Sequence, residues 1–374
     1  MGSSRRWCTS PTMLPVALIA VLLLLTGCAT HDSTSTAVTH DFGGRVDTTT
    51  NSLLLDGSPW QPVGFNAYQL GTDWSVNRGC GAEVDLDRYF SALPARSLTR
   101  FNLYASFAVS VTTGGLDFAP LDAVFAAAER HHQMVLPVLT GSSGACEDNQ
   151  FKDRQWYVYG WRTTPHVGGL TYAQWLPIAV KRWAGRTSLA GWELVGEPEA
   201  SSCGAGGCAW QQRLCAPGAA QVLRDFFDSA GAQLREIDDR HPIFSGTTGG
   251  DQCSLAGDDI LTVGASPNID ILDYHDYRYD DGAPPAGSDL PTRLSQSRQL
   301  GKPLVVTELG MKAGSCRTLQ ERYDTLREQT LTERRSGVAA ILFWAFVPDP
   351  RPTECTYDIG FDDPLWQVVS DLNR

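Results

Sequence analysis

A regular alternation of apolar, strand-like runs with helical patterns constrains the fold of this chain more than any other feature. The strand-like runs are short, rich in Val, Ile, Leu and aromatic residues, and lack a long polar–apolar alternation, which is typical of buried parallel strands. The eight runs are Gln61–Asn66, Thr99–Tyr104, Met134–Leu139, Ala190–Val195, Ile243–Thr247, Ile269–Tyr274, Leu304–Thr307 and Ala340–Phe346.

Helical patterns separate these runs. After Pro120, which suits a first helical position, apolar residues recur at intervals of three and four, as on one helix face. Strict strand–helix alternation favours a parallel sheet, and eight repeats favour its closure into a single-domain (β/α)8 TIM barrel over residues 46–374. Three more helical patterns span Val222–Ile237, Leu319 to near Gly337, and Pro364–Leu372. Weaker patterns begin near Val84, Tyr172 and Pro291, and the weakest is the short Asp258–Val263.

The N-terminal residues predict a targeting signal. Positive charge precedes an apolar run, Leu14–Leu25, which is too short to span a bilayer comfortably, so residues 1–27 are interpreted as a signal peptide. Its Leu-Thr-Gly-Cys ending resembles a bacterial lipoprotein signal. That resemblance implies lipid on Cys28 and anchoring to the outer face of the cell membrane, with residues 28–45 as a flexible tether. A plain secretory signal is the alternative.

Charge and composition exclude some partners. The formal net charge is −12, and no basic patch is present, which argues against nucleic acid as a partner. This charge is compatible with an enzyme that acts on neutral polymers. We expect a monomer that needs neither cofactor nor metal.

The cysteines beyond Cys28 predict disulfides. Eight is an even number, and an exported chain favours their pairing. A zinc site is disfavoured because the chain has no Cys-x-x-Cys pair and no His at a suitable spacing. All eight follow predicted strands, and Cys316 with Cys355 is the expected pair because their loops would be neighbours; the other pairings stay open. The set is Cys80, Cys146, Cys203, Cys208, Cys215, Cys253, Cys316 and Cys355.

Two of the predicted strands lead into a glutamate. The fourth leads into Glu197 and the seventh into Glu308. Isolated buried carboxylates are costly, so an acid after an apolar strand is unexpected for a pure core strand. The active site of a TIM barrel lies where its strands end. Hydrolysis of a glycosidic bond generally uses two carboxyl groups that flank the bond.

The placement of these glutamates resembles that in clan A retaining glycosidases, and within them glycoside hydrolase family 5. In that family the acid/base glutamate follows the fourth strand in an Asn-Glu-Pro motif, and the nucleophile ends the seventh strand. The resemblance therefore implies that Glu197 is the acid/base and Glu308 the nucleophile.

Further segments match the family in chain order. Gly64–Tyr68 resembles the first-strand segment of the mannanase-like members. By resemblance, Arg100 orients the nucleophile and Trp344 floors the sugar site. His275 and Tyr277 resemble the His-x-Tyr after the sixth strand. Arg can hold a carboxylate ionised by bidentate pairing; Tyr277 is expected to hydrogen-bond the nucleophile, and His275 the sugar.

One position departs from the family pattern. Gly196 replaces the Asn that normally contacts the sugar 2-hydroxyl. Asn66 and Asn102 are the candidates to replace that contact. Glu199 shares strand parity with Glu197 and is a fallback acid.

Aromatic residues in the predicted loops are candidates for sugar-stacking subsites. The alternative is that several of them cap the barrel. They are Trp74, Phe151, Trp156, Tyr157, Tyr159, Trp161 and Trp210.

The sequence thus predicts an exported retaining β-glycosidase. Its substrate is expected to be a mannan- or glucan-like β-linked polysaccharide, by resemblance. The Ala- and Arg-rich, Lys-poor composition leaves a β-galactofuranosidase or another actinobacterial envelope-glycan hydrolase as the alternative. A non-catalytic carbohydrate-binding lipoprotein would have no use for the paired glutamates. A metal-dependent hydrolase would need ligands at several strand ends, and the chain has only seven His.

Overall fold

The computed structural model describes residues 43–374 and confirms the predicted barrel. Eight parallel strands lie side by side in the order β10-β7-β6-β5-β4-β14-β12-β11, and a bridge from Phe244 to Ile271 joins the two ends of this sheet. Each of the eight predicted runs contains or overlaps one of these strands. They are β4 Val63–Asn66, β5 Leu98–Asn102, β6 Met134–Val138, β7 Trp192–Glu193, β10 Ile243–Phe244, β11 Leu272–Asp276, β12 Leu304–Gly310 and β14 Ile341–Trp344.

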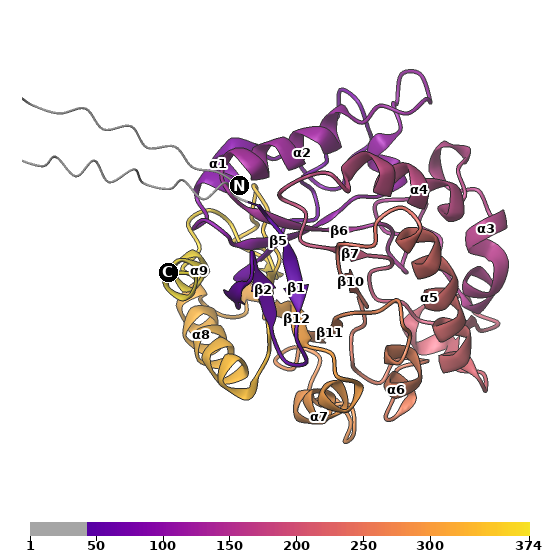
Figure 1. Cartoon of the computed structure of the whole chain (residues 1–374). Helices are drawn as coiled ribbons and strands as arrows, with labels where there is room; N and C mark the ends of the chain where they lie inside the picture. Colours follow the sequence, from indigo (N-terminus) through magenta and orange to yellow (C-terminus); the bar gives the residue numbers. More distant parts are fainter. Residues whose placement is uncertain (1–42) are drawn as a thin grey trace, which may run out of the picture. The chain divides into compact units, whose positions relative to one another are not determined.

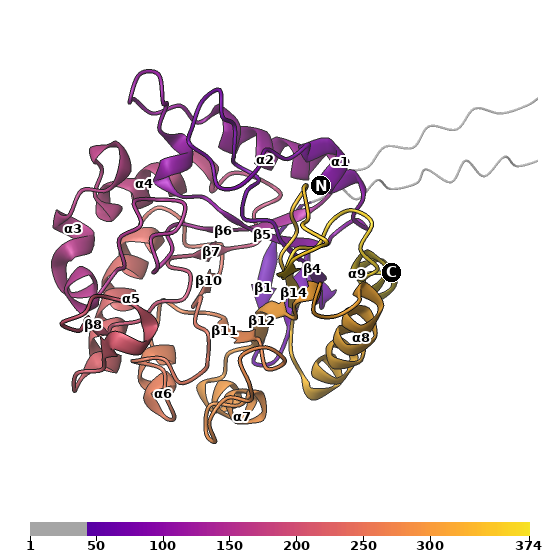
Figure 2. The same ribbon diagram turned by 180° about the vertical axis from the view of Figure 1, so that it is seen from behind.

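Helices surround the barrel in both views (Figures 1 and 2). Pro120 lies in the first turn of its helix, as predicted. The helix at Leu319 begins with a capping box from Thr318 and Glu321 and ends at Gly337, whose φ of 102° suits a glycine cap. The helices are α1 Leu86–Ser91, α2 Ala119–Arg130, α3 Trp161–Thr163, α4 Tyr172–Trp183, α5 Ala219–Arg235, α6 Asp259–Gly264, α7 Leu290–Leu300, α8 Leu319–Ser336 and α9 Leu365–Leu372.

A small antiparallel sheet covers the end of the barrel at which the strands begin. It consists of β1 (Val46–Thr48), β2 (Leu53–Leu55) and β3 (Ser58–Trp60), and β1 and β2 lie in front of the barrel strands in Figure 1. Apolar side chains of this sheet form one buried cluster with barrel residues such as Leu98 and Met134. The sequence analysis missed this sheet because its strands are too short to give a pattern.

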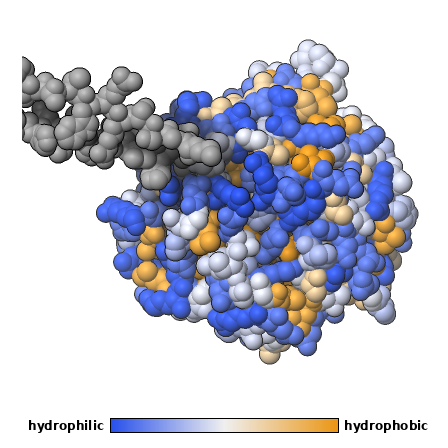
Figure 3. All heavy atoms as spheres, viewed as in Figure 1, coloured by the Kyte–Doolittle hydropathy of each residue, from blue (hydrophilic) through white to orange (hydrophobic). Residues whose placement is uncertain are grey.

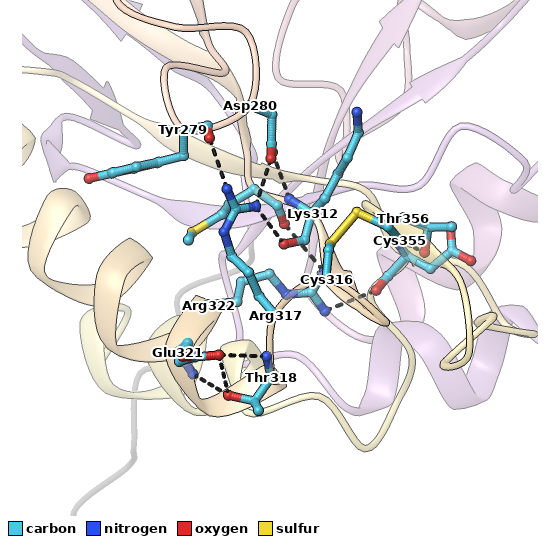
Figure 4. Close-up of a disulfide and its surroundings, with 12 residues drawn as sticks. Tyr279, Asp280, Lys312, Cys316, Arg317, Thr318, Glu321, Arg322, Cys355 and Thr356 are labelled. Atoms are coloured by element: carbon cyan, nitrogen blue, oxygen red, sulfur yellow. Dashed lines mark hydrogen bonds and ion pairs between the residues drawn. A yellow bond between two sulfur atoms is a disulfide. The ribbon is translucent and has the colours of Figure 1, made fainter.

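Four disulfides lie in the loops that follow the barrel strands within residues 43–374, and three of them join different loops. The expected pair Cys316–Cys355 is confirmed. It lies beside a two-stranded ladder of β13 (Ala313–Gly314) and β15 (Cys355–Thr356), which joins the loops after β12 and β14 (Figure 4). These loops form the rim on the side of Glu308. The other pairs are Cys80–Cys146, Cys203–Cys208 and Cys215–Cys253.

Hydrophilic residues cover most of the face seen in Figure 3, and the apolar residues there form small separate groups. Within residues 43–374, every helix is too short or too polar to cross a lipid bilayer. The predicted signal peptide, Cys28 and most of the tether lie outside the described residues.

Candidate active site

The two predicted carboxylates meet at the end of the barrel where the strands finish. Glu308 lies within β12 and is 5% exposed. Glu197 follows β7 in a left-handed backbone conformation with φ of 54°, and its N–H donates to the Gly246 carbonyl at 2.9 Å. One oxygen of each carboxylate and the Nδ1 atom of His275 all lie within 4.8 Å of one another. The side chain of Glu197 keeps 41% of its accessible surface, so it faces open space.

Arg100 on β5 hydrogen-bonds Glu308. Its Nη1 donates to Glu308 Oε1 at 2.8 Å and to Asn66 Oδ1 at 2.9 Å. Its other edge, Nε and Nη2, donates to the two oxygens of Glu193 at 2.7 and 2.6 Å. The amide nitrogen of Asn66 donates to the Thr307 carbonyl. The amide oxygen and the amide nitrogen of Asn66 are therefore both hydrogen-bonded, and Asn66 helps to hold Arg100 in place.

Glu193 is the site residue that the sequence analysis did not assign. It is fully buried in β7, and its two oxygens both face Arg100. A bidentate pair of this kind fixes the guanidinium in position and direction. The signal in the sequence was an acid inside the apolar run Gly191–Val195. A carboxylate buried in the barrel interior is costly unless a cation pairs with it.

His275 and Tyr277 lie against the carboxylates. The hydroxyl of Tyr277 donates to Glu308 Oε2, as expected. His275 differs from the expectation that it would contact the sugar. Its Nδ1 lies 2.8 Å from Glu197 Oε1 and 3.3 Å from Glu308 Oε2, so the ring stands between the two carboxylates. The reason is the bulge in the β11–β12 pairing between Tyr274 and His275, which places His275 beside Glu308 in the register.

Burial and charge set the pKa values of this cluster. Burial raises the pKa of Glu308, and although His275 and Arg100 oppose this, the pKa stays above the ordinary 4.5. For Glu197, burial also raises the pKa, but the hydrogen bond and charge of His275 outweigh it and bring the pKa below 4.5. Burial lowers the pKa of His275, whereas the charges of Glu308 and Glu197 raise it above 6.5. The two carboxylates therefore favour the protonated form of the His275 ring.

These shifts predict the pH profile of kcat/KM. With Glu308 as the nucleophile that the resemblance implies, attack requires its ionised form, so activity falls as the pH drops through a pKa that is raised above 4.5. Proton donation requires that the His275–Glu197 pair keep its proton, so activity falls again as the pH rises through a pKa above 6.5. Initial rates at low substrate concentration between pH 3 and pH 10 measure the acidic and the alkaline limb of this profile. Each limb should follow about one ionisation.

Stability over the same pH range is the control for this profile. Asp273 is buried under the site with its pKa raised by burial to about 7, so it could titrate with the alkaline limb. Thermal unfolding at each pH separates loss of fold from loss of catalysis. An alkaline limb below pH 6.5 in folded enzyme would contradict the assignment to His275.

The fallback acid Glu199 does not take part in this cluster. Glu199 is 2% exposed, and its carboxylate pairs with Arg213 at 2.7 Å. It lines neither of the two cavities that Glu197 lines. Of these two acids, Glu197 is the one that lies beside His275 and Glu308.

Two cavities meet at Glu197. One, of about 570 Å³, also contains Glu308, Asn102 and Trp344 and is called the glycone cavity below. The indole of Trp344 is half-buried and stacks on Tyr68, with centroids 5.6 Å apart and ring planes 18° apart. The other, of about 670 Å³, contains His275 and Trp210 and is called the leaving-group cavity below. The arrangement is that of an open cleft with the carboxylates at its middle.

The predicted sugar-stacking aromatics divide into two groups. Trp156, Tyr157 and Trp161 are buried and pack their rings around Phe226 of α5, so for these three the prediction was wrong and the capping alternative holds. The reason is that the segment folds into a helical turn that turns these rings inward. Exposed rings remain at Trp74, Tyr159 and Trp210, with Trp210 in the leaving-group cavity; Phe151 packs against Arg213.

Glu197, His275 and Glu308 could also hold a metal ion, because each presents one ligand atom to the same point. A metal-bound His normally donates its other N–H to an acceptor. Among residues 43–374, Nε2 of His275 is buried without such a partner. The cluster is thus better suited to share a proton than to hold a metal.

Comparisons with known proteins agree with this fold. A probable mannan endo-1,4-β-mannosidase A from Aspergillus clavatus is 22% identical over 350 residues, which cover 87% of this chain and 88% of the relative. The endo-1,4-β-mannanase structure from Rhizomucor miehei superposes with a TM-score of 0.62 at 16% identity and covers 88% of this chain and 98% of its own. A glycoside hydrolase family 5 mannosidase from Rhizomucor miehei gives 0.57 at 16% identity, with 88% and 97% covered. No protein family model matches the chain.

The barrel, the two carboxylates at its strand ends and these relatives together define the protein as a glycoside hydrolase. Within that class, its likeness is to the glycoside hydrolase family 5 barrels.

Proposed function

We propose that this protein is an exported retaining β-glycosidase that cleaves a mannan-like β-linked polysaccharide. The observation that carries the retaining mechanism is the approach of Glu197 and Glu308 to within 4.8 Å. Retaining enzymes place their carboxyl groups ~5–5.5 Å apart, whereas inverting enzymes need ~6.5–9.5 Å to admit a water molecule between carboxylate and sugar.

In the first step, a Glu308 oxygen attacks the anomeric carbon and forms an ester bond to the sugar. The bond from that carbon to the leaving oxygen breaks, and Glu197 gives its proton to this oxygen. In the second step, water attacks the same carbon, Glu197 takes a proton from the water, and the ester bond breaks. Glu308 returns to its carboxylate form, so two inversions retain the configuration.

His275 supplies Glu197 with its proton. Nδ1 of His275 lies 2.8 Å from Glu197 Oε1, and the charges of the two carboxylates raise the pKa of this ring. A sugar that enters the cleft shields Glu197 from water and disfavours its charged form, which moves the shared proton towards the carboxylate. Glu197 thus becomes an acid when substrate is bound.

The substrate assignment rests on the relatives and on the shape of the cleft. Relatives from Aspergillus clavatus and Emericella nidulans are named mannan endo-1,4-β-mannosidases. The two cavities extend on both sides of Glu197, which suits a chain bound across the cleft rather than a single sugar. Trp344 offers a stacking face on the Glu308 side and Trp210 on the other.

Proton NMR during hydrolysis tests this function. The purified protein is incubated with β-1,4-mannan, β-1,4-glucan and an aryl β-galactofuranoside, and the anomeric signals of new reducing ends are followed over time. The proposal expects cleavage of mannan with the β-anomer appearing first. Immediate appearance of the α-anomer would contradict retention, and cleavage of the galactofuranoside alone would replace mannan as substrate.

Export and lipid anchoring are part of the same proposal. Their support is the signal-like sequence that ends at Cys28 and the four disulfides within residues 43–374, which are typical of oxidising compartments. Mass spectrometry of the N-terminal peptide from the membrane fraction should find acylated Cys28. A soluble product with an unmodified N-terminus would replace the anchor by a plain secretory signal.

A further inference from the structure

We propose that Asn102 binds the 2-hydroxyl of the sugar in the glycone cavity and so replaces the contact that Gly196 cannot make. This inference rests on the proposed function and deepens it. A hydrogen bond to the 2-hydroxyl strengthens in the transition state of glycoside hydrolysis, so the residue that makes it contributes to the rate as well as to the choice of sugar.

The position of Gly196 carries no side chain and is crowded. A Cβ atom there would lie 3.1 Å from Nη2 of Arg100 and 3.3 Å from Cγ1 of Val138. Arg100 cannot withdraw, because Glu193 and Glu308 hold its guanidinium on two edges. The hydroxyl partner must therefore come from a neighbouring strand.

Asn66 is not that partner. Its amide oxygen accepts from Arg100 and its amide nitrogen donates to the Thr307 carbonyl. Its side chain is almost completely buried and does not line the glycone cavity.

Asn102 has the position and the free polar atoms. It is the last residue of β5, two positions beyond Arg100, so both side chains leave the strand on the same face. In the register it pairs with Val138, the residue that a side chain at position 196 would contact. Asn102 thus lies next to the space where the family Asn would be.

The amide of Asn102 is poised for a ligand. It lines the glycone cavity together with Glu197 and Glu308 and is only 8% exposed. Within residues 43–374, its side chain makes no hydrogen bond, so its two donors and its acceptor are open to a ligand in the cavity. A sugar hydroxyl can accept from this amide and donate to it at once.

Other polar groups in the cavity lie on other walls. Ser142 and Ser143 belong to the loop after β6. Lys312 belongs to the loop after β12, and in Figure 4 its ammonium group points away from the Cys316–Cys355 disulfide and makes no drawn contact. The backbone N–H of Ser142 donates to the Gly196 carbonyl at 2.9 Å, but the side chains of these three residues are not among the atoms nearest to a Cβ at position 196.

The test compares two substrates on each enzyme. One is an aryl β-mannobioside, and the other lacks the 2-hydroxyl on the sugar that is bonded to the aryl group. Their kcat/KM ratio does not depend on the active fraction of a preparation. The intrinsic effect of the missing hydroxyl cancels when ratios are compared between enzymes. Wild type, Asn102→Ala, Asn102→Ser and Ser143→Ala are measured.

Removal of the 2-hydroxyl lowers kcat/KM, and we call the ratio of the two kcat/KM values the penalty. We expect this penalty to be about 100-fold smaller in Asn102→Ala than in wild type. On the full substrate, Asn102→Ala should lower mainly kcat. Ser143→Ala should keep the wild-type penalty. If Asn102→Ala does not fold, Asn102→Ser gives the same comparison with a side chain too short for the contact. An unchanged penalty in the folded variant would overturn the role of Asn102. Absence of turnover on the full substrate and on the polysaccharides above would instead overturn the proposed function.

Discussion

Glu308→Ala is expected to lower kcat on the order of 10⁵-fold or more on every substrate, because the step that forms the glycosyl–enzyme bond loses its nucleophile. The loss should be equally large for good and poor leaving groups. The fold should survive the change, since Arg100 keeps its bidentate pair with Glu193. Burst and steady-state kinetics with aryl glycosides, together with thermal unfolding, measure both quantities.

Glu328→Ala is the matched control for this variant. Glu328 lies on α8, its side chain is 70% exposed, and it forms an ion pair with Arg335 at 3.4 Å. Removal of this surface acid should leave kcat unchanged. A loss of less than tenfold in Glu308→Ala, similar to that of the control, would contradict the role of Glu308.

Glu197→Ala should give a loss that depends on the leaving group. For polysaccharide and other poor leaving groups, loss of the general acid is expected to cost about 10²–10⁴-fold in kcat/KM. Activated aryl glycosides need little protonation, so their first step should be nearly normal and the glycosyl–enzyme should accumulate. A plot of log(kcat/KM) against leaving-group pKa should therefore be much steeper for the variant than for wild type.

Azide provides the second readout for this variant. A small anion can enter the space left by the carboxylate and attack the glycosyl–enzyme without base assistance, so it should restore turnover of activated substrates and give a β-glycosyl azide. The same slope as wild type and no response to azide would contradict the acid/base role. Because His275 loses its partner at 2.8 Å, the alkaline limb of the pH profile should also move.

The barrel was predictable from the sequence because each of its strands is an apolar run that is followed by a helical pattern. Even short strands such as β7 and β10 were located, since the residues around them are buried on all sides. The pair Glu197 and Glu308 was predictable because both lie directly after such runs. The β1–β3 sheet was not, because strands of three residues carry no periodicity.

The contacts within the site could not be predicted from the sequence. The pairing of Glu193 with Arg100 joins residues 93 positions apart, and its geometry depends on the barrel register. The place of His275 depends on a bulge that leaves no mark in the sequence. Strand parity suggested Glu199 as an acid, but the chain turns after Glu197 and takes Glu199 to Arg213 instead.

The central claim is that Glu308 forms a covalent bond to the sugar. The test is incubation with an activated 2-deoxy-2-fluoro β-mannobioside. Its fluorine should slow the hydrolysis of the glycosyl–enzyme more than its formation, so that the covalent intermediate accumulates. Mass spectrometry of the intact protein should then show one added disaccharide, and peptide mapping should place it on Glu308, with no adduct in Glu308→Ala. A protein that hydrolyses mannan but carries the sugar on another residue, or forms no adduct while the reagent is consumed, would contradict the account.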